Sequence, residues 1–233
     1  MAALITGGAD RIGRAVALCC ADLGYDIALH YSQSSEKARA TKKEILSKRV
    51  NCRLYRSDFN NFSKTVRLVG DASRAAKLSV LINNASLFFE SSLQTGSYEE
   101  FERLFNVNFK APYALIKEFA RIVKRGIIIN ILDTEIVRNQ TRYFDYLLTK
   151  KFLSDLTGMA AYHLAPDIRV NAIAPGLILP PAGKDMDFLW KRSEDIPLKT
   201  VGSTRSVTHA VKFLIESDFV TGQTIFVDGG ESL

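Results

Sequence analysis

The sequence predicts an α/β fold in which helices cover both faces of a doubly wound, seven-stranded parallel sheet. Short β-branched and apolar runs alternate with amphipathic stretches along the 233 residues, as expected for repeated βαβ units. A hydrophobic fraction of 47% suits a sheet that is buried on both faces. We expect strands at Ala2–Thr6, Asp26–Tyr31, Asn51–Arg56, Ser79–Ile82, Gly126–Leu132, Arg169–Ile173 and Gln223–Val227.

The length fits one dinucleotide-binding catalytic domain over residues 1–233, because α/β folds of this size commonly stand as a single unit. In a doubly wound sheet, right-handed crossovers place the ligand crevice beyond the carboxyl ends of the strands. We expect the polar clusters that follow the predicted strands to line this crevice. The long connection at about 177–197 contains Pro180, Pro181 and Gly183, and it is a candidate substrate lid.

Composition argues against several classes of partner. The formal charge of +6 comes from basic residues interspersed with acidic ones, so no nucleic-acid partner is expected. Cys19, Cys20 and Cys52 are odd in number and lack CxxC spacing, which favours free thiols in a reducing cytoplasm and no metal site. No leader precedes the first strand and no run is long enough to span a membrane, so we expect a cytoplasmic protein without membrane contact.

A glycine-rich turn joins the first predicted strand to the first helix. Glycine lets the backbone approach a pyrophosphate, and the helix amino terminus presents unpaired N–H groups and the positive end of its dipole. This placement after a strand and before a helix is typical of the Rossmann dinucleotide fingerprint, although a plain tight turn is the alternative. The predicted cofactor contacts here are Gly7, Arg11, Ile12 and Gly13.

The end of the second strand indicates which cofactor binds. An NAD site commonly places a carboxylate there for the ribose hydroxyls, but the segment His30–Ser34 has none. With Arg11 as a charged partner, the segment favours NADPH. His30, Tyr31, Ser32 and Ser34 are predicted cofactor contacts, and a packing or capping role for His30 stays open.

Two further clusters belong to the predicted cofactor end. Asp58 follows the third strand, where it either accepts a bond from the adenine amino group or caps the helix beginning near Asn61. Asn84, Ala85 and Ser86 follow the fourth strand and are predicted to lie beside the cofactor, with loop stabilisation as the alternative.

Tyr146 and Lys150 are four residues apart, so on a helix both side chains project from one face. A nearby ammonium favours tyrosinate, so we expect Lys150 to lower the pKa of the phenol and make Tyr146 a proton donor and acceptor. The alternative is an ordinary surface pair.

These features together resemble the short-chain dehydrogenase/reductase family over essentially the whole chain. The resemblance rests on the glycine turn, Asn83–Ala85 (NNA), Asn108, the Tyr146 and Lys150 pair, Asn171–Gly176 (NAIAPG) and Val227–Gly230 (VDGG). It implies hydride transfer from a nicotinamide that Pro175 and Gly176 contact. It also implies that Tyr146 donates the proton, Lys150 binds the nicotinamide ribose, and Asn108 supports a proton-relay water.

The family resemblance also implies a homotetramer. It would be built from long helices, here those containing Asn108–Lys124 and Arg142–Tyr162, and the terminal residues 231–233 could then approach a neighbouring site.

Two departures from the general family pattern narrow the resemblance. Arg11 replaces a glycine that most members have, and Asp133 replaces the usual serine thirteen residues before Tyr146. A carboxylate suits a ring nitrogen that must receive a proton better than a carbonyl oxygen gaining negative charge.

Both departures resemble the pteridine reductase branch, which includes dihydromonapterin reductases. In that branch the matches of Asp133 and Tyr146 supply protons, and the match of Phe88 sandwiches the pterin against nicotinamide. The matches of Arg11 and Ser86 contact cofactor phosphate and pterin, and Leu177 is a further expected substrate contact. Gln33 departs from the branch, because its parasite enzymes carry an arginine there.

The sequence therefore predicts NADPH-dependent reduction of a dihydropterin, with dihydrofolate as a further candidate. A hydride would go to a ring carbon, and Tyr146 or Asp133 would deliver the proton. A ketoacyl-type carbonyl reductase and a cofactor-binding protein without turnover remain alternatives. Phe88 has its own alternative, which is simple packing in the core.

Overall fold

The structure is a computed structural model that describes residues 1–181 and 183–233. Its seven strands form one parallel sheet in the order β3-β2-β1-β4-β5-β6-β7. The predicted doubly wound sheet is therefore confirmed. The strands are β1 (Ala2–Ile5), β2 (Asp26–Tyr31), β3 (Cys52–Arg56), β4 (Leu78–Asn83), β5 (Gly126–Ile131), β6 (Ile168–Pro175) and β7 (Thr224–Val227).

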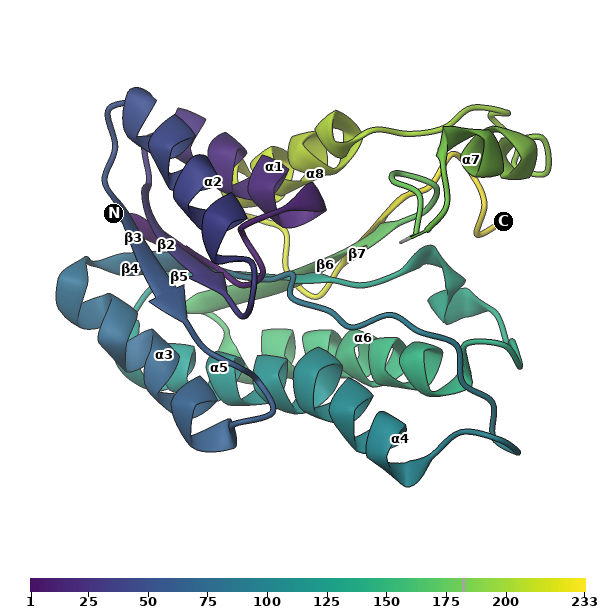
Figure 1. Cartoon of the computed structure of the whole chain (residues 1–233). Coiled ribbons are helices and arrows are strands. Elements are labelled where there is room, and N and C mark those ends of the chain that lie inside the picture. Colours follow the sequence, from purple (N-terminus) through teal and green to yellow (C-terminus); the bar gives the residue numbers. More distant parts are fainter. Residues whose placement is uncertain (182) are drawn as a thin grey trace.

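Helices cover both faces of the sheet, as Figure 1 shows. One face carries α1 (Arg11–Asp22), α2 (Ser35–Ser47) and α8 (Thr204–Glu216). The other face carries α3 (Phe62–Ala75), α4 (Tyr98–Phe105), α5 (Ala111–Ile122) and α6 (Phe144–Leu164). The remaining α-helix, α7 (Met186–Ser193), lies beyond the end of the sheet near the C-terminus, inside the predicted lid connection.

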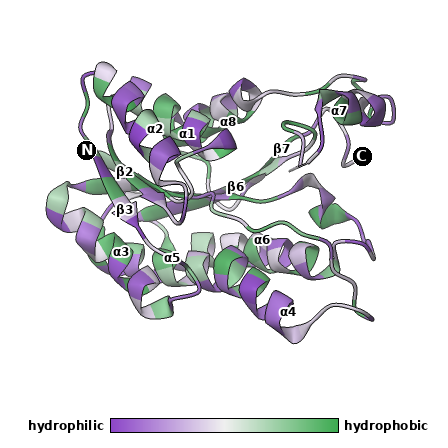
Figure 2. Cartoon of the chain, in the orientation of Figure 1, coloured by the Kyte–Doolittle hydropathy of each residue, from purple (hydrophilic) through white to green (hydrophobic). Residues whose placement is uncertain are grey.

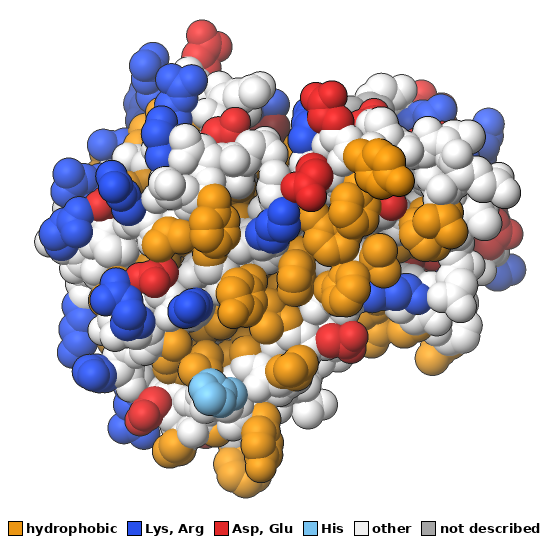
Figure 3. All heavy atoms as spheres, turned by 90° about the horizontal axis from the view of Figure 1, so that it is seen from below, with side chains coloured by type: hydrophobic (Ala, Val, Ile, Leu, Met, Phe, Trp, Pro, Cys, Tyr) orange, Lys and Arg blue, Asp and Glu red, His pale blue; other side chains and the backbone are white. Residues whose placement is uncertain are grey.

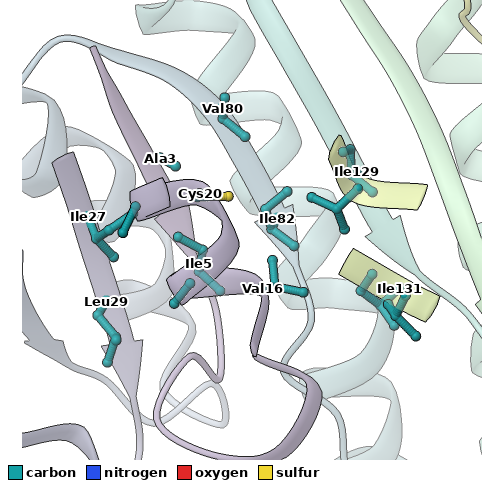
Figure 4. Packing of buried hydrophobic residues seen from close by; sticks show 14 of the residues in the cluster. Ala3, Ile5, Val16, Cys20, Ile27, Leu29, Val80, Ile82, Ile129 and Ile131 are labelled. Atoms are coloured by element: carbon teal, nitrogen blue, oxygen red, sulfur yellow. The ribbon is translucent and has the colours of Figure 1, made fainter. Parts of the chain in front are cut away.

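Two hydrophobic cores hold these layers, because successive side chains of a buried parallel strand point to opposite faces. Ile5, Ile82 and Ile129 pack toward Val16 and Cys20 of α1 (Figure 4). Their neighbours Leu4, Leu81 and Ile128 belong to the second core, on the other face. Figure 2 accordingly shows apolar strands in the centre and hydrophilic positions on the outer helix surfaces.

The strand order changes direction between β1 and β4, because β2 and β3 lie on one side of β1 and the later strands lie on the other. The carboxyl ends of β1 and β4 are therefore the edges of the crevice where a doubly wound sheet binds its ligand. Within the described residues, no helix is both long and apolar enough to cross a membrane.

Candidate active site

The glycine turn after β1 has a geometry that only glycine satisfies at two positions. Gly7 has φ +60°, and a Cβ there would lie 2.9 Å from the Ala85 Cα. A Cβ on Gly13 would lie 2.1 Å from the carbonyl oxygen of Gly7. The turn can therefore press the start of α1 against the loop after β4, and this close backbone approach fits a pyrophosphate at the helix amino terminus.

Arg11 also has a positive φ, +52°, although it is not glycine. This conformation favours glycine, which explains why a glycine is expected at this position in the wider family. The side chain is exposed, and its Nη2 donates to the Pro180 carbonyl oxygen at 2.8 Å. Arg11 thus joins the cofactor turn to the predicted lid connection.

Thr6, which the sequence reasoning missed, ties the glycine turn to the loop after β4. Its Oγ1 accepts the backbone N–H groups of Asn84, at 2.9 Å, and Ala85, at 3.0 Å. The Asn84 side-chain amide donates to the carbonyl oxygens of Thr6, at 3.0 Å, and Gly7, at 3.2 Å. The predicted loop stabilisation by Asn84 is therefore present, and it brings Asn84 and Ala85 to the crevice edge.

His30 lies inside the protein, and both of its ring nitrogens are used there. Its side chain is 1% exposed, and Nδ1 accepts the Gly7 N–H at 3.2 Å. Nε2, which must then carry the proton, donates to the Ser57 carbonyl oxygen at 3.0 Å. The ring stacks on Phe59, and burial lowers the pKa of His30 to about 4. The packing role that the sequence left open for His30 is therefore present, because the ring holds the glycine turn from behind.

The other predicted contacts at this end have mixed outcomes. Ser32 and Ser34 are exposed after β2, where a ligand can reach them, and Tyr31 and Ile12 are half-buried against the core of the α1 face. Asp58 does not cap the next helix, because the side chain of Asn61 accepts the capping N–H of Lys64. Asp58 Oδ1 instead accepts hydrogen bonds from the backbone N–H and the side-chain amide of Asn60, at 3.0 Å each.

Asp133 and Tyr146 face one another in the crevice. Asp133 lies two residues beyond the end of β5, and Tyr146 lies in the first turn of α6. The Tyr146 hydroxyl donates to Asp133 Oδ2 at 2.8 Å, while Asp133 Oδ1 accepts the Glu135 N–H at 2.9 Å. A phenol and a carboxylate thus share one proton at the carboxyl end of the central strands.

Burial raises the pKa of the Tyr146 phenol well above its usual value, and Asp133 raises it further because a tyrosinate would face a second negative charge. The prediction that Lys150 lowers this pKa is therefore wrong. The phenol keeps its proton at neutral pH, so the pair is arranged to donate a proton rather than to accept one.

Lys150 lies under Tyr146 on the same face of α6, as the four-residue spacing predicts. Its Nζ is 5.7 Å from the centroid of the Tyr146 ring and donates to the Ile131 carbonyl oxygen at 2.9 Å. Burial lowers the pKa of the Lys150 ammonium to about 8, although Asp133 opposes the shift. The ammonium is 3% exposed, so the alternative of a surface pair is wrong.

Asn108 is buried in a π-helical turn, Asn106–Lys110, between α4 and α5. Its Oδ1 accepts the Leu87 N–H at 2.8 Å, and its Nδ2 donates to the Leu87 carbonyl oxygen at 2.9 Å. The same Nδ2 lies 3.3 Å from Thr149 Oγ1 on α6. Asn108 thus fixes the segment after β4 that carries Ser86 and Phe88. π-Helical turns of this kind frequently occur at functional sites.

Phe88 is not a core residue, because 46% of its side chain is exposed. One ring face stacks on Tyr143 with centroids 4.6 Å apart, and the ring meets Tyr146 edge-on at 4.8 Å. The remaining surface is free for a planar ligand. Ser86 next to it is also exposed, and its hydroxyl donates only to the Leu87 carbonyl oxygen, at 3.3 Å. Tyr143 was missed by the sequence reasoning.

Pro175 and Gly176 end β6 and begin the lid connection, in which residue 182 lies outside the described residues. A Cβ on Gly176 would lie 2.7 Å from Glu231 Oε2, so the C-terminal turn packs directly against this point. Leu177 packs with Leu189 and Ile196 in a small cluster that gives the connection its own hydrophobic core.

The C-terminal turn belongs to this chain's own crevice. Glu231 is 5% exposed, and its Oε1 accepts from Arg192 of α7 at 2.9 Å. Thr134, next to Asp133, donates its hydroxyl to Asp228 at 2.6 Å. The expectation that residues 231–233 approach a neighbouring site in an assembly stays a prediction. Burial raises the pKa of the Glu231 carboxyl in this turn.

Comparisons with known proteins match nearly the whole chain. The family model described as Enoyl-(Acyl carrier protein) reductase matches residues 7–232. The 3-oxoacyl-(acyl-carrier-protein) reductase FabG of Staphylococcus epidermidis is 31% identical over 237 residues, covering 98% of this chain and 97% of its own. General stress protein 39 of Bacillus subtilis is 34% identical over 98% of this chain and 83% of its own length.

Solved structures resemble the fold closely. FolM Alternative dihydrofolate reductase 1 from Brucella suis, in complex with NADP, has a TM-score of 0.94 and 31% identity, and the match covers 99% of this chain and 94% of that chain. A blue fluorescent protein from a metagenomic library, in complex with NADPH, has a TM-score of 0.92 and 28% identity, with 100% and 98% covered. The chain therefore belongs to the short-chain dehydrogenase/reductase family of oxidoreductases.

Proposed function

We propose that the protein is an NADPH-dependent reductase of dihydropterins, with dihydrofolate as a further candidate substrate. The observation that carries the proposal is the 2.8 Å hydrogen bond from the Tyr146 hydroxyl to Asp133. A carbonyl reductase needs neutral or positive donors around an oxygen that gains negative charge. A carboxylate beside the phenol is suited instead to a basic ring nitrogen, which gains a proton as the neighbouring carbon is reduced.

The proposed cofactor is supported by the fit of the crevice and by relatives that bind it. The glycine turn and the absence of a carboxylate within His30–Ser34 suit a phosphorylated dinucleotide. FolM from Brucella suis was solved with NADP, and the metagenomic blue fluorescent protein was solved with NADPH. When bound, NADPH supplies the hydride that the substrate carbon accepts.

The chain's own residues then have separate tasks. Tyr146, whose raised pKa keeps it protonated, delivers the proton to the ring nitrogen. Asp133 accepts the phenol's hydrogen bond and orients it, and it offers an acceptor to the N–H groups of a pterin. Lys150 binds the nicotinamide ribose, and Asn108 holds the segment on which Phe88 stacks against the pterin.

A second candidate is a ketoacyl-type carbonyl reductase, which the FabG relatives favour. The two candidates separate when NADPH oxidation is followed with a dihydropterin, dihydrofolate and a 3-ketoacyl thioester side by side. We expect turnover with the dihydropterin. Turnover with the thioester alone would exclude the pterin proposal.

The variant Asp133→Ser sharpens the test, because it installs the side chain that most of the family has. We expect dihydropterin turnover to fall about 100-fold, in the range of a lost acid–base partner, with NADPH binding unchanged. Unchanged pterin turnover would remove Asp133 from proton delivery. A gain of thioester turnover would identify Asp133 as the residue that separates the two substrate classes.

We also propose that copies of this chain associate through the outer face of α5 and α6, as the expected homotetramer requires. Figure 3 shows hydrophobic side chains gathered on the face formed by the lower helix layer. Tyr113 of α5 and Met159 and Tyr162 of α6 are exposed and line one groove. Light scattering on Met159→Glu tests this assignment. We expect a smaller assembly than the wild type, whereas an unchanged mass would exclude this face.

A further inference from the structure

Arg56 is the last residue of β3, and the sheet places it beside the end of β2. In the parallel register Arg56 pairs with Tyr31, so its side chain stands next to the segment Ser32–Ser34. Its Nε donates to the Ser32 carbonyl oxygen at 3.3 Å. The guanidinium therefore lies at the exposed rim where the adenosine half of a dinucleotide ends.

This rim otherwise lacks the positive charge that a ribose 2′-phosphate needs. The hydroxyls of Ser32 and Ser34 are neutral, Gln33 is neutral, and His30 is buried with both nitrogens already bonded. The residues at the end of β2 therefore include no free cationic side chain that could bind the 2′-phosphate of NADPH.

Three other cations near this part of the crevice are engaged elsewhere. Lys37 forms an ion pair with Asp10, and Arg14 forms one with Glu44. Arg11 donates to the Pro180 carbonyl oxygen. Arg56, by contrast, takes part in no ion pair within the described residues, and both of its NH2 groups remain without a protein acceptor there.

We propose that Arg56 determines the preference for NADPH by binding its 2′-phosphate, with the Ser32 and Ser34 hydroxyls as neutral partners. An arginine held through Nε presents its two NH2 groups as a fork, which is the geometry that binds phosphate oxygens in pairs. Glu36 and Asp58 are the nearby carboxylates in sequence, and neither pairs with Arg56. Without Arg56 they would leave this rim repulsive to a phosphate.

The inference rests on the proposed function only in taking NADPH as the cofactor, and the substrate does not enter it. The probes are therefore nucleotides that differ by the 2′-phosphate alone, namely 2′,5′-ADP against 5′-AMP and NADPH against NADH. Binding is measured by calorimetry on the full chain, with no reducible substrate present.

For Arg56→Ala we expect the affinity for 2′,5′-ADP and NADPH to fall about tenfold or more, as for a lost hydrogen bond to a charged group. The affinities for 5′-AMP and NADH should change by less than about twofold. Arg56→Lys keeps the charge but not the fork, so it should lose less than the alanine variant.

Arg53→Ala is the matched control. Arg53 lies on the same strand, is also exposed, and rests over the Tyr55 ring with 5.9 Å to the centroid. Its removal takes away the same charge three residues earlier and should not change the ratio of 2′,5′-ADP to 5′-AMP affinity. An equal loss in both alanine variants would reduce the effect to long-range attraction and overturn the proposal.

The proposal is also overturned if Arg56→Ala lowers the affinities for 2′,5′-ADP and 5′-AMP equally, or if it lowers neither affinity. A wild-type protein that binds both equally would overturn it as well. Failure of the proposed function looks different: absence of dihydropterin turnover beside an Arg56-dependent preference for 2′,5′-ADP would sink the substrate assignment and leave this inference standing.

Discussion

Two regions of the crevice differ sharply in how the protein holds them. We call Asn108, Asp133, Tyr146 and Lys150 the catalytic cluster; Asn108, Tyr146 and Lys150 are between 1% and 6% exposed, and all four residues are hydrogen-bonded within the chain. We call Arg11, Phe88 and residues 177–181 the outer wall. Here Phe88 is 46% exposed, and the Arg11 side chain has one hydrogen bond, to the Pro180 carbonyl oxygen.

This difference indicates that the catalytic cluster carries out the chemistry, whereas the outer wall determines which ligand binds. Buried hydrogen bonds hold the catalytic cluster in one geometry before any ligand arrives, which is what proton transfer requires. In the outer wall, Arg11 and Phe88 keep exposed surface that can meet ligand atoms, although Leu177 packs with Leu189 and Ile196. Changes in the cluster should therefore cost rate, whereas changes in the wall should cost affinity.

The largest expected effect is on rate in Tyr146→Phe. Removing the hydroxyl removes the proposed proton donor, so kcat should fall about 10²- to 10⁴-fold. NADPH affinity, measured by nucleotide fluorescence, should stay within a few-fold, because the ring and Lys150 remain. A kcat within tenfold of the wild-type value would contradict the assignment of the rate to the catalytic cluster, because Tyr146 would then not be an essential proton donor.

The next effect concerns His30, a predicted cofactor contact whose ring is buried. The unfolded chain takes up a proton near pH 6.5, whereas the folded protein keeps this ring neutral until about pH 4. The neutral ring therefore adds to the free energy of unfolding above pH 6.5. This contribution, about 3 kcal/mol, is lost as the pH falls toward 4.

The free energy of unfolding in urea, measured at pH 7 and at pH 4.5, checks this prediction. His30→Gln cannot titrate in this range, so its loss of stability over the same interval should be smaller than that of the wild type. Other acid-sensitive groups are common to both proteins and cancel in the difference. Equal losses in the two proteins would contradict the buried, neutral state of His30.

The smallest effect is expected in the outer wall. Phe88→Ala should raise the KM for the dihydropterin by up to about tenfold, the contribution of one aromatic stack. NADPH affinity and the free energy of unfolding should change little, because the ring is half exposed. Phe219→Ala removes an equally large but fully exposed ring and serves as the control. Equal losses of pterin and NADPH affinity in Phe88→Ala would make Phe88 a packing residue.

Much of the fold followed from local patterns. The seven strands were predicted to within a residue or two at most ends, because buried parallel strands are short apolar runs between amphipathic helices. β6 was predicted to stop at Ile173 but continues to Pro175, where its residues still pair with β7. Pairing with an edge neighbour is invisible in the local pattern, so this end could not be predicted.

The sites were predicted less evenly. The spacing of Tyr146 and Lys150 was enough to place them on one helical face, since that relation is fixed by 3.6 residues per turn. The direction in which the pKa of Tyr146 shifts could not be predicted from that spacing. It depends on the burial of the phenol and on Asp133, thirteen residues away. Asp58 failed as a cap for a local reason: Asn61 accepts the Lys64 N–H, and Asp58 accepts the N–H groups of Asn60.

The sequence by itself determined the parallel α/β fold, the glycine turn at the end of β1 and the residue types around one crevice, because these follow from periodicity and backbone sterics. Only the tertiary structure decided that His30 turns inward to Gly7 and Ser57 while Arg56 stands at the rim beside Ser32. Each of these contacts joins residues 23 to 27 positions apart, on neighbouring strands or at their ends. Which side chains meet across such distances is set by strand register and by the cost of burying an unpaired polar group.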